Sequence, residues 1–296
     1  MVCIACGSDN LNRRLRVTSQ LSIAFCGNCH SGRAELPPDA EALGLIYDAE
    51  YYDAGGVADR NIDREVLKRA TFARRLDDCA KLIPDGGCIL DLGCATGFFL
   101  QEAEERGWRS FGVDISAAAI GLCQPKTKPE RLYCGQFENA TFRENPTNEF
   151  DAIFMSDYLE HVLDPASVIG VAVNRLRAGG AIVINTPDVQ SLSRKLMGKH
   201  WPHFKIEHVS YFSLEGITGL FDTAGLDVVA SWPTVKALSI AYLARHFEKY
   251  PNKWISPWLT TLGRALPGSA ANAIMWIPTG ELTLVGKRRQ AANTAK

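Results

Sequence analysis

Residues 86–108 read GGCILDLGCATGFFLQEAEERGW, and this stretch decides the fold. A short apolar run ends at Asp91, a turn carries Gly93 and Gly97, and a helical pattern follows to about Arg106. A strand, a glycine-bearing turn and a helix in this order open a parallel sheet. The sequence therefore predicts an α/β fold with a ligand site at the carboxyl end of this strand.

A second apolar run, SFGVDIS at 110–116, ends in Asp114, 23 positions after Asp91. An acid at the tip of the second strand can accept hydrogen bonds from the ribose hydroxyls of a nucleoside. The same pattern could equally bind a nicotinamide dinucleotide, or the glycines could merely form a tight turn with no ligand. However, the turn lacks G-x-G-x-x-G, and the carboxylate of Asp91 would repel a pyrophosphate. A cationic sulfonium nucleoside suits this charge better.

Two C-x-x-C pairs precede residue 30, and nineteen residues separate them: Cys3 and Cys6, then Cys26 and Cys29. Two such knuckles joined by a short hairpin can complete a tetrahedral shell around a structural Zn²⁺. The alternatives are a redox pair or a ribbon that binds nucleic acid through a local basic patch (Arg13, Arg14 and Arg16). With four protein ligands the ion would have no catalytic role.

Bulk properties point to a soluble, cytoplasmic protein with a small or local partner. The chain has 296 residues, 46% of them hydrophobic and 22% charged, with a net charge of −1. This balance gives no general attraction to nucleic acid or membrane. No secretory signal or membrane-spanning run is evident. Cys88 and Cys134 lie in strand-like runs, where we expect buried thiols.

The motif DLGCATG at 91–97, followed by GVDI at 112–115, resembles the class I S-adenosylmethionine-dependent methyltransferases. The usual pattern is acid-x-G-x-G-x-G, and here Ala95 replaces the middle glycine. The similarity covers about residues 63–232 and a final strand at 281–287. It implies a Rossmann-like sheet of seven strands, the last antiparallel, with S-adenosylmethionine as cofactor. The implied cofactor contacts are Asp91, Leu92, Gly93, Cys94, Gly97, Asp114, Ile115, Gln136, Phe137 and Met155.

The chain is expected to divide into a zinc ribbon, a linker and the methyltransferase domain. The predicted ranges are 1–35 for the ribbon, 36–62 for a linker with aromatic residues, 63–288 for the domain with a helical insertion at 233–280, and 289–296 for a disordered tail. Within the domain we expect a helix at 63–83, strands at 150–156 and 182–185, and a break at Gly179–Gly180. The insertion either caps the acceptor pocket or buries an apolar face in a homo-oligomer.

Histidines follow the fourth and fifth strands, where the acceptor of an open α/β sheet should bind. His161 is the first candidate for the base that deprotonates an acceptor hydroxyl, and His208 is the second, oriented by Glu207. His161 could equally be a buried residue that ties a turn to a carbonyl. Trp201 and Phe204 are expected in a lid over this site.

The ribbon, the Leu-Glu-His turn and the E-H-x-x-Y-F-S segment are similar to bacterial methyltransferases of sugar, cell-envelope and secondary-metabolite pathways. The leading expectation is methyl transfer to a hydroxyl of a small-molecule or glycan-type acceptor. One alternative is C-methylation of a nucleotide-linked keto sugar. A second is a non-catalytic zinc-ribbon module that binds RNA or protein, although nucleic acid is not the expected partner.

Overall fold

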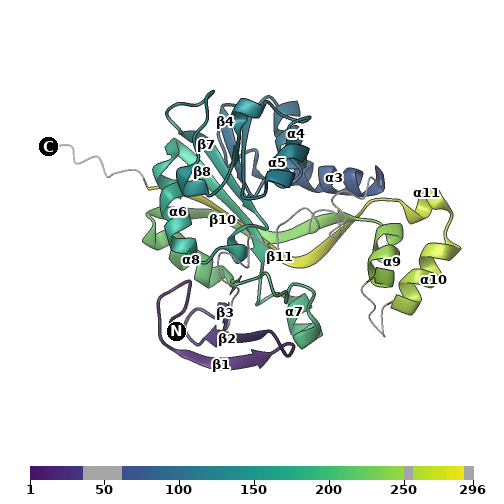
Figure 1. Ribbon diagram of the computed structural model, residues 1–296. Helices are drawn as coiled ribbons and strands as arrows, with labels where there is room; N and C mark the ends of the chain where they lie inside the picture. The colour runs from purple at the N-terminus through teal and green to yellow at the C-terminus, as the bar shows by residue number, and fades with distance from the viewer. Residues whose placement is uncertain (36–61, 250–255, 290–296) are drawn as a thin grey trace.

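The computed structural model describes residues 1–35, 62–249 and 256–289. Two sheets form the protein (Figure 1): seven strands in the order β10-β11-β8-β7-β4-β5-β6, and four in the order β1-β2-β3-β9. In the large sheet β11 runs antiparallel to both neighbours, while the pairs from β8 to β6 are parallel. The predicted Rossmann-like methyltransferase sheet, with its reversed last strand, is confirmed.

The elements have the following bounds. The large sheet contains β4 (Cys88–Leu92), β5 (Arg109–Asp114), β6 (Leu132–Cys134), β7 (Phe150–Ser156), β8 (Leu176–Pro187), β10 (Leu226–Leu238) and β11 (Met275–Arg288). The small sheet contains β1 (Leu11–Arg16), β2 (Ser22–Cys26), β3 (Gly32–Ala34) and β9 (Ser210–Tyr211). The helices are α3 (Ile62–Cys79), α4 (Phe98–Glu105), α5 (Ala117–Cys123), α6 (Pro165–Asn174), α7 (Leu192–Met197), α8 (Leu214–Thr223), α9 (Ile240–Lys249), α10 (Ser256–Ala265) and α11 (Gly268–Ala271), with short 3₁₀ turns at Leu159–His161 and Gly198–His200.

Both faces of the large sheet are buried because successive side chains along a strand point to opposite sides. In β7, Ala152 and Phe154 pack with residues of α3, α4 and α5, whereas Ile153 and Met155 pack with residues of α6 and α8. Figure 1 shows these two groups of helices on either side of the sheet. Since the strands are apolar on both faces, polar chemistry is confined to their ends.

The small sheet joins the N-terminal ribbon to the domain built on the large sheet. β3 pairs antiparallel with β9, and Gly32 lies opposite Tyr211. Ala34 N–H donates to the carbonyl of Val209 at 3.1 Å. Figure 1 shows the ribbon beside the segment that carries α7 and β9. The strand that completes the ribbon thus begins two residues after His208.

Several boundaries differ from those expected. β8 begins at Leu176 and passes through Gly179–Gly180, where the register with β7 shifts between Phe150 and Ala152. The predicted break is therefore a bulge inside a strand. Cys88 is buried as expected, but Cys134 is exposed because β6 is the edge strand of the sheet.

The region predicted as a helical insertion starts and ends as strand. β10 extends to Leu238 and β11 starts at Met275, so the helices α9 to α11 lie between them and project from the sheet (Figure 1). The linker with Tyr51 and Tyr52 (residues 36–61) and the tail (residues 290–296) lie outside the described residues. Among the helices of the described ranges, none combines the length and apolarity needed to span a bilayer.

Candidate cofactor and acceptor site

The turn after β4 needs glycine at two positions. Gly93 and Gly97 both have φ +74°, in the left-handed region that glycine favours, and Gly97 precedes the first residue of α4. A Cβ on Gly93 would lie 2.8 Å from Cδ2 of Tyr158. Gly93 N–H donates to the carbonyl of Val113 at 2.8 Å, which ties the turn to the tip of β5. The turn is therefore packed tightly between the tips of β4, β5 and β7.

The two predicted cofactor acids are buried at neighbouring strand tips. Asp91 is 3% and Asp114 6% exposed, and β4 pairs directly with β5. Burial, together with the charge of Asp114, raises the pKa of Asp91 well above its usual range. Oδ1 of Asp91 has no hydrogen-bond partner among the described residues. A buried carboxyl group with an unused oxygen fits a ligand that carries a positive charge.

Asp114 already holds the glycine turn in shape. Its Oδ2 accepts from Ala95 N–H at 2.9 Å, and its Oδ1 accepts from Ser116 N–H at 2.9 Å. A carboxylate oxygen can accept more than one hydrogen bond, so a role in the turn is compatible with accepting from ribose hydroxyls. Asp114 can therefore serve both the turn and a bound nucleoside.

The other predicted cofactor contacts divide by exposure. Ile115 is 52% exposed and Gln136 is also exposed, beyond the tips of β5 and β6. The remaining side chains are buried: Leu92, Cys94, Phe137 and Met155. Met155 is fully buried among α6 and α8 residues, so its side chain offers a cofactor no exposed surface. The contacts of this set with a cofactor stay predictions.

Ala95 takes up a backbone conformation that suits glycine. Its φ is +45°, which costs an L-residue with a Cβ about 1 to 2 kcal/mol. We expect Ala95→Gly to raise the free energy of unfolding by about 0.5 to 1 kcal/mol, because part of the relieved strain is offset by the greater unfolded-state freedom of glycine. Urea denaturation measures this. Ala70→Gly, inside α3, should instead destabilise by about 1 kcal/mol, and a loss of stability in both variants would contradict the assigned strain.

The structure brings His161 and His208 together. Their ring centroids are 4.6 Å apart, with the planes at 89°. His161 Nδ1 lies 3.1 Å from the backbone carbonyl of Glu207. Burial lowers the pKa of His161 to about 4 and that of His208 well below its usual range. Both rings are therefore neutral near pH 7.

Glu207 does not take the predicted position beside His208. Its carboxylate Oε1 lies 3.7 Å from Nζ of Lys205, and its backbone carbonyl, rather than its side chain, contacts a histidine. That histidine is His161. His208 Nδ1 is buried without a hydrogen-bond partner among the described residues. The orienting group at this site is thus a carbonyl.

Sequence reasoning missed Glu160, although it lies inside the quoted Leu-Glu-His turn. Glu160 is 1% exposed, and its Oε2 accepts from Thr186 Oγ at 2.9 Å. Burial and the charge of Asp157 raise its pKa to about 8. One donor atom each from Glu160, His161 and His208 lies within 4.8 Å of the others, a spacing that also suits a metal ion.

The four N-terminal cysteines form one cluster. Their Sγ atoms all lie within 4.8 Å of one another. Sγ of Cys3 is 3.4 Å from that of Cys29, and Sγ of Cys6 is 3.6 Å from that of Cys26. Tetrahedral zinc with Zn–S bonds of about 2.3 Å places its sulfurs about 3.8 Å apart. The cluster therefore fits a tetrahedral thiolate site.

The predicted lid residues pack against the ribbon. Trp201 is 2% exposed, shares a core cluster with Ile23 and Tyr211, and donates from Nε1 to Ser193 Oγ at 3.0 Å. Its ring lies 5.2 Å from that of Phe204. These aromatics therefore support the segment that leads to His208.

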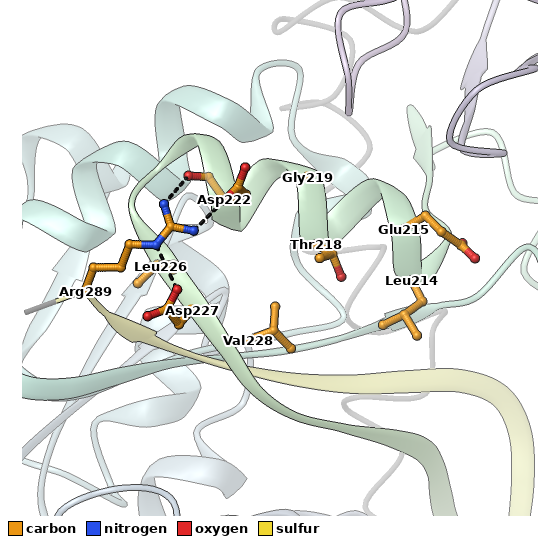
Figure 2. Close-up of a pocket in the computed structure, with 9 residues that line it drawn as sticks. All are labelled: Leu214, Glu215, Thr218, Gly219, Asp222, Leu226, Asp227, Val228 and Arg289. Atoms are coloured by element: carbon orange, nitrogen blue, oxygen red, sulfur yellow. Dashed lines mark hydrogen bonds and ion pairs between the residues drawn. The ribbon is translucent and has the colours of Figure 1, made fainter.

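A surface hollow lies elsewhere, between α8 and the start of β10. Figure 2 shows Asp222 and Asp227 there, both bound to the guanidinium of Arg289, with Leu214 and Val228 further along. It shares no residue with the strand tips that carry Asp91, Asp114 and His161. We therefore assign it no role in catalysis.

The sheet, the glycine turn and the two buried acids define an S-adenosylmethionine-dependent methyltransferase. A family model described as a methyltransferase domain matches residues 63–231. That range is more than half of the chain, and the protein belongs to this family.

Curated relatives and solved structures agree with this class. The chain is 29% identical over 104 residues to the ubiquinone biosynthesis O-methyltransferase of Aeromonas salmonicida (34% of this chain, 43% of the relative) and 30% identical over 123 residues to that of Alkalilimnicola ehrlichii (38% and 47%). The aligned part thus spans less than half the length of these relatives.

Two solved structures show the same fold. A SAM-dependent methyltransferase from Archaeoglobus fulgidus superposes with a TM-score of 0.52 at 17% identity, covering 80% of this chain and 100% of that one. Magnesium protoporphyrin IX methyltransferase from Synechocystis PCC 6803, solved with bound SAH, gives 0.52 at 12% identity, covering 85% and 100%.

Removal of the Asp114 carboxylate should weaken cofactor binding. We expect Asp114→Ala to lower the affinity for S-adenosylhomocysteine about 10- to 150-fold, because a hydrogen bond to a charged group contributes about 1.5 to 3 kcal/mol. Isothermal titration calorimetry measures this. Asp85→Ala, an exposed acid just before β4, is the matched control and should bind normally. Equal affinity in both variants would refute the assignment.

Proposed function

We propose that this methyltransferase acts on a hydroxyl oxygen of a small-molecule or glycan-type acceptor, with His161 as the base. The distant O-methyltransferase relatives support transfer to oxygen. The observation that carries the proposal is the environment of His161. It lies just after β7, at the end of the sheet where ligands of open α/β folds bind.

The tautomer of His161 follows from its partner. A carbonyl oxygen can only accept, so Nδ1 must carry the proton and donate to Glu207. Because the ring is neutral, Nε2 then holds the basic lone pair. His161 is thus prepared to accept a proton near neutral pH without first losing one.

Each group has one task in the proposed reaction. S-adenosylmethionine, when bound, would supply an electrophilic methyl group for the acceptor oxygen. Asp91 would hold the positively charged cofactor, and Asp114 would accept hydrogen bonds from its ribose hydroxyls. Nε2 of His161 takes the proton of the acceptor hydroxyl, and the Glu207 carbonyl stabilises the resulting imidazolium.

We further propose that the four-cysteine cluster holds one structural Zn²⁺, with Cys3, Cys6, Cys26 and Cys29 as ligands. The short sulfur separations and the complete thiolate set support zinc over a redox pair. Four protein ligands leave no position for a substrate.

Transfer of a labelled methyl group tests the proposal. The full chain is incubated with methyl-labelled S-adenosylmethionine and a library of phenols, sugars and nucleotide sugars, and products are analysed by mass spectrometry. We expect label in an ether that acid cleavage returns to the alcohol. A labelled product that resists ether cleavage would replace the proposal with carbon methylation. RNA and a protein mixture are incubated in parallel, and label confined to either of them would replace the proposal with a macromolecular acceptor.

A further inference from the structure

A cluster of four charged side chains, two of them buried, lies beside the proposed acceptor site. It gathers Arg75 of α3, Asp157 just after β7, Lys236 of β10 and Glu281 of β11. The side chain of Arg75 is 4% exposed and that of Glu281 is 0% exposed. Residues so distant in sequence meet because α3 packs against the end of the sheet where β10 and β11 lie (Figure 1).

These four groups compensate one another. Nζ of Lys236 lies 2.5 Å from Oε1 of Glu281 and 3.3 Å from Oδ1 of Asp157. The guanidinium of Arg75 lies 3.3 Å from Glu281 and 3.5 Å from Asp157. Two cations thus face two carboxylates. His203 lies 3.7 Å from Glu281, and it is neutral because burial lowers its pKa. The cluster of Arg75, Asp157, Lys236 and Glu281 therefore carries no net charge.

Helix α3 adds two cations, Arg64 and Lys68, for which no ion pair with a described residue is found, although the charge of Asp157 acts on Lys68. Arg64 and Lys68 lie eleven and seven residues before Arg75, which places all three within about 40° on one helical face. Lys68 makes no hydrogen bond or ion pair with a described residue, and burial, followed by the charges of Arg64 and Lys236, lowers its pKa to about 8. Nε of Arg64 is buried and unpaired, while its guanidinium lies over the ring of Tyr242. A half-buried positive charge without an ion-pair partner among the described residues favours an anion beside it.

The cluster is close to the cofactor turn. Asp157 directly precedes Tyr158, whose ring lies against Gly93 of the turn. The positive charge of Arg75 also tends to lower the pKa of Asp91. The charges of Asp157 and Lys236 act on Lys68, so an anion held by Lys68 would lie on the side of α3 that faces this cluster.

We propose that Lys68 and Arg64 form a subsite for an anionic group, a carboxylate or a phosphate, on the methyl acceptor. The inference rests on the proposed function, since it describes the acceptor of the same reaction. It narrows the acceptor from any hydroxyl compound to an acidic one.

Binding of small probes to the full chain tests the subsite. Benzoate, phenyl phosphate and the neutral benzyl alcohol are titrated by calorimetry, with and without saturating S-adenosylhomocysteine. We expect at least one of the two anions to bind, benzyl alcohol to bind at least tenfold more weakly, and Lys68→Met to lower the anion affinity tenfold or more. Lys68→Arg, which keeps the charge, should stay within about threefold of the natural chain. Lys81→Met, an exposed lysine just beyond α3, is the matched control and should bind as the natural chain does.

The outcomes separate the subsite from the proposed function. If neither anion binds, or if Lys68→Met binds anions like the control, the subsite is refuted while S-adenosylhomocysteine binding still supports the methyltransferase site. If S-adenosylhomocysteine fails to bind but anion affinity still depends on Lys68, the subsite stands and the proposed function falls. Thermal denaturation verifies that each variant is folded.

Discussion

Replacement of His161 by alanine is expected to lower kcat by about 10²- to 10⁴-fold, the usual contribution of a positioned general base. The affinity for S-adenosylhomocysteine should stay within about threefold, because the cofactor acids Asp91 and Asp114 lie on other strands. Single-turnover methyl transfer to the acceptor found in the labelled screen, together with calorimetry, measures both quantities.

His200 supplies the matched control. It is an exposed histidine in the segment after β8, and His200→Ala should keep the natural kcat. If His161 acts as a base, imidazole added to the alanine variant should restore part of the rate. A His161→Ala variant with a normal kcat would show that the ring only ties its turn to the Glu207 carbonyl, which is the structural role that the sequence also allowed.

The pH profile distinguishes a buried base from an exposed one. Because burial lowers the pKa of His161 to about 4, its neutral, basic form persists down to that pH. We expect kcat to show no inflection near 6.5 and to fall as pH falls through about 4. Circular dichroism at each pH verifies that the chain is still folded. An inflection near 6.5 would indicate a solvent-exposed base and contradict the assignment.

Strands that begin and end with clear signals could be predicted from the sequence. The expected strand at 150–156 is β7, since an apolar run there is followed by the polar Asp157. The longer strands extend past their expected ends: β8 continues through the glycine pair that was predicted as a break, and β10 continues past residue 233, where the insertion was expected to begin. Gly179–Gly180 forms a bulge in β8, and Pro233 lies in β10, an edge strand that tolerates a residue without an N–H donor.

The parts of the site that depend on long-range pairing could not be predicted. The glycine turn and Asp91 belong to one strand-turn-helix pattern, and Asp114 ends the next strand, so local sequence signals were enough to place them at the strand tips. The ion pair between Arg75 and Glu281 joins positions 206 residues apart, and neither residue has a distinctive neighbour in sequence. Glu207 was assigned from its proximity to His208 in sequence, whereas the fold directs its carbonyl to His161. Such contacts require the strand order and register.

Loss of the proposed ribbon zinc is expected to lower kcat at least tenfold while sparing the cofactor site. Ser213 Oγ donates to the carbonyl of Cys29 at 2.5 Å and accepts from Gly216 N–H at 3.0 Å, so it joins a proposed zinc ligand to the start of α8. The residues that follow His208 are therefore held at two places: β9 pairs with β3, and Ser213 bonds to the carbonyl of Cys29. Structural zinc supplies about 10 to 16 kcal/mol to the folding of small thiolate domains, so the ribbon should unfold without it.

Cys26→Ser and chelation by a strong zinc ligand test this dependence. Metal analysis should give one zinc per natural chain. Both treatments should lower kcat at least tenfold. The reason is that Val209 and Tyr211 lose their partners in β3, so His208 is no longer held beside His161. S-adenosylhomocysteine affinity should change less than about threefold, since Asp91 and Asp114 lie on the large sheet. Cys134→Ser, at an exposed cysteine of β6, controls for thiol loss. A metal-free chain with the natural kcat would mean that the ribbon serves another partner, and that the domain alone positions its histidines.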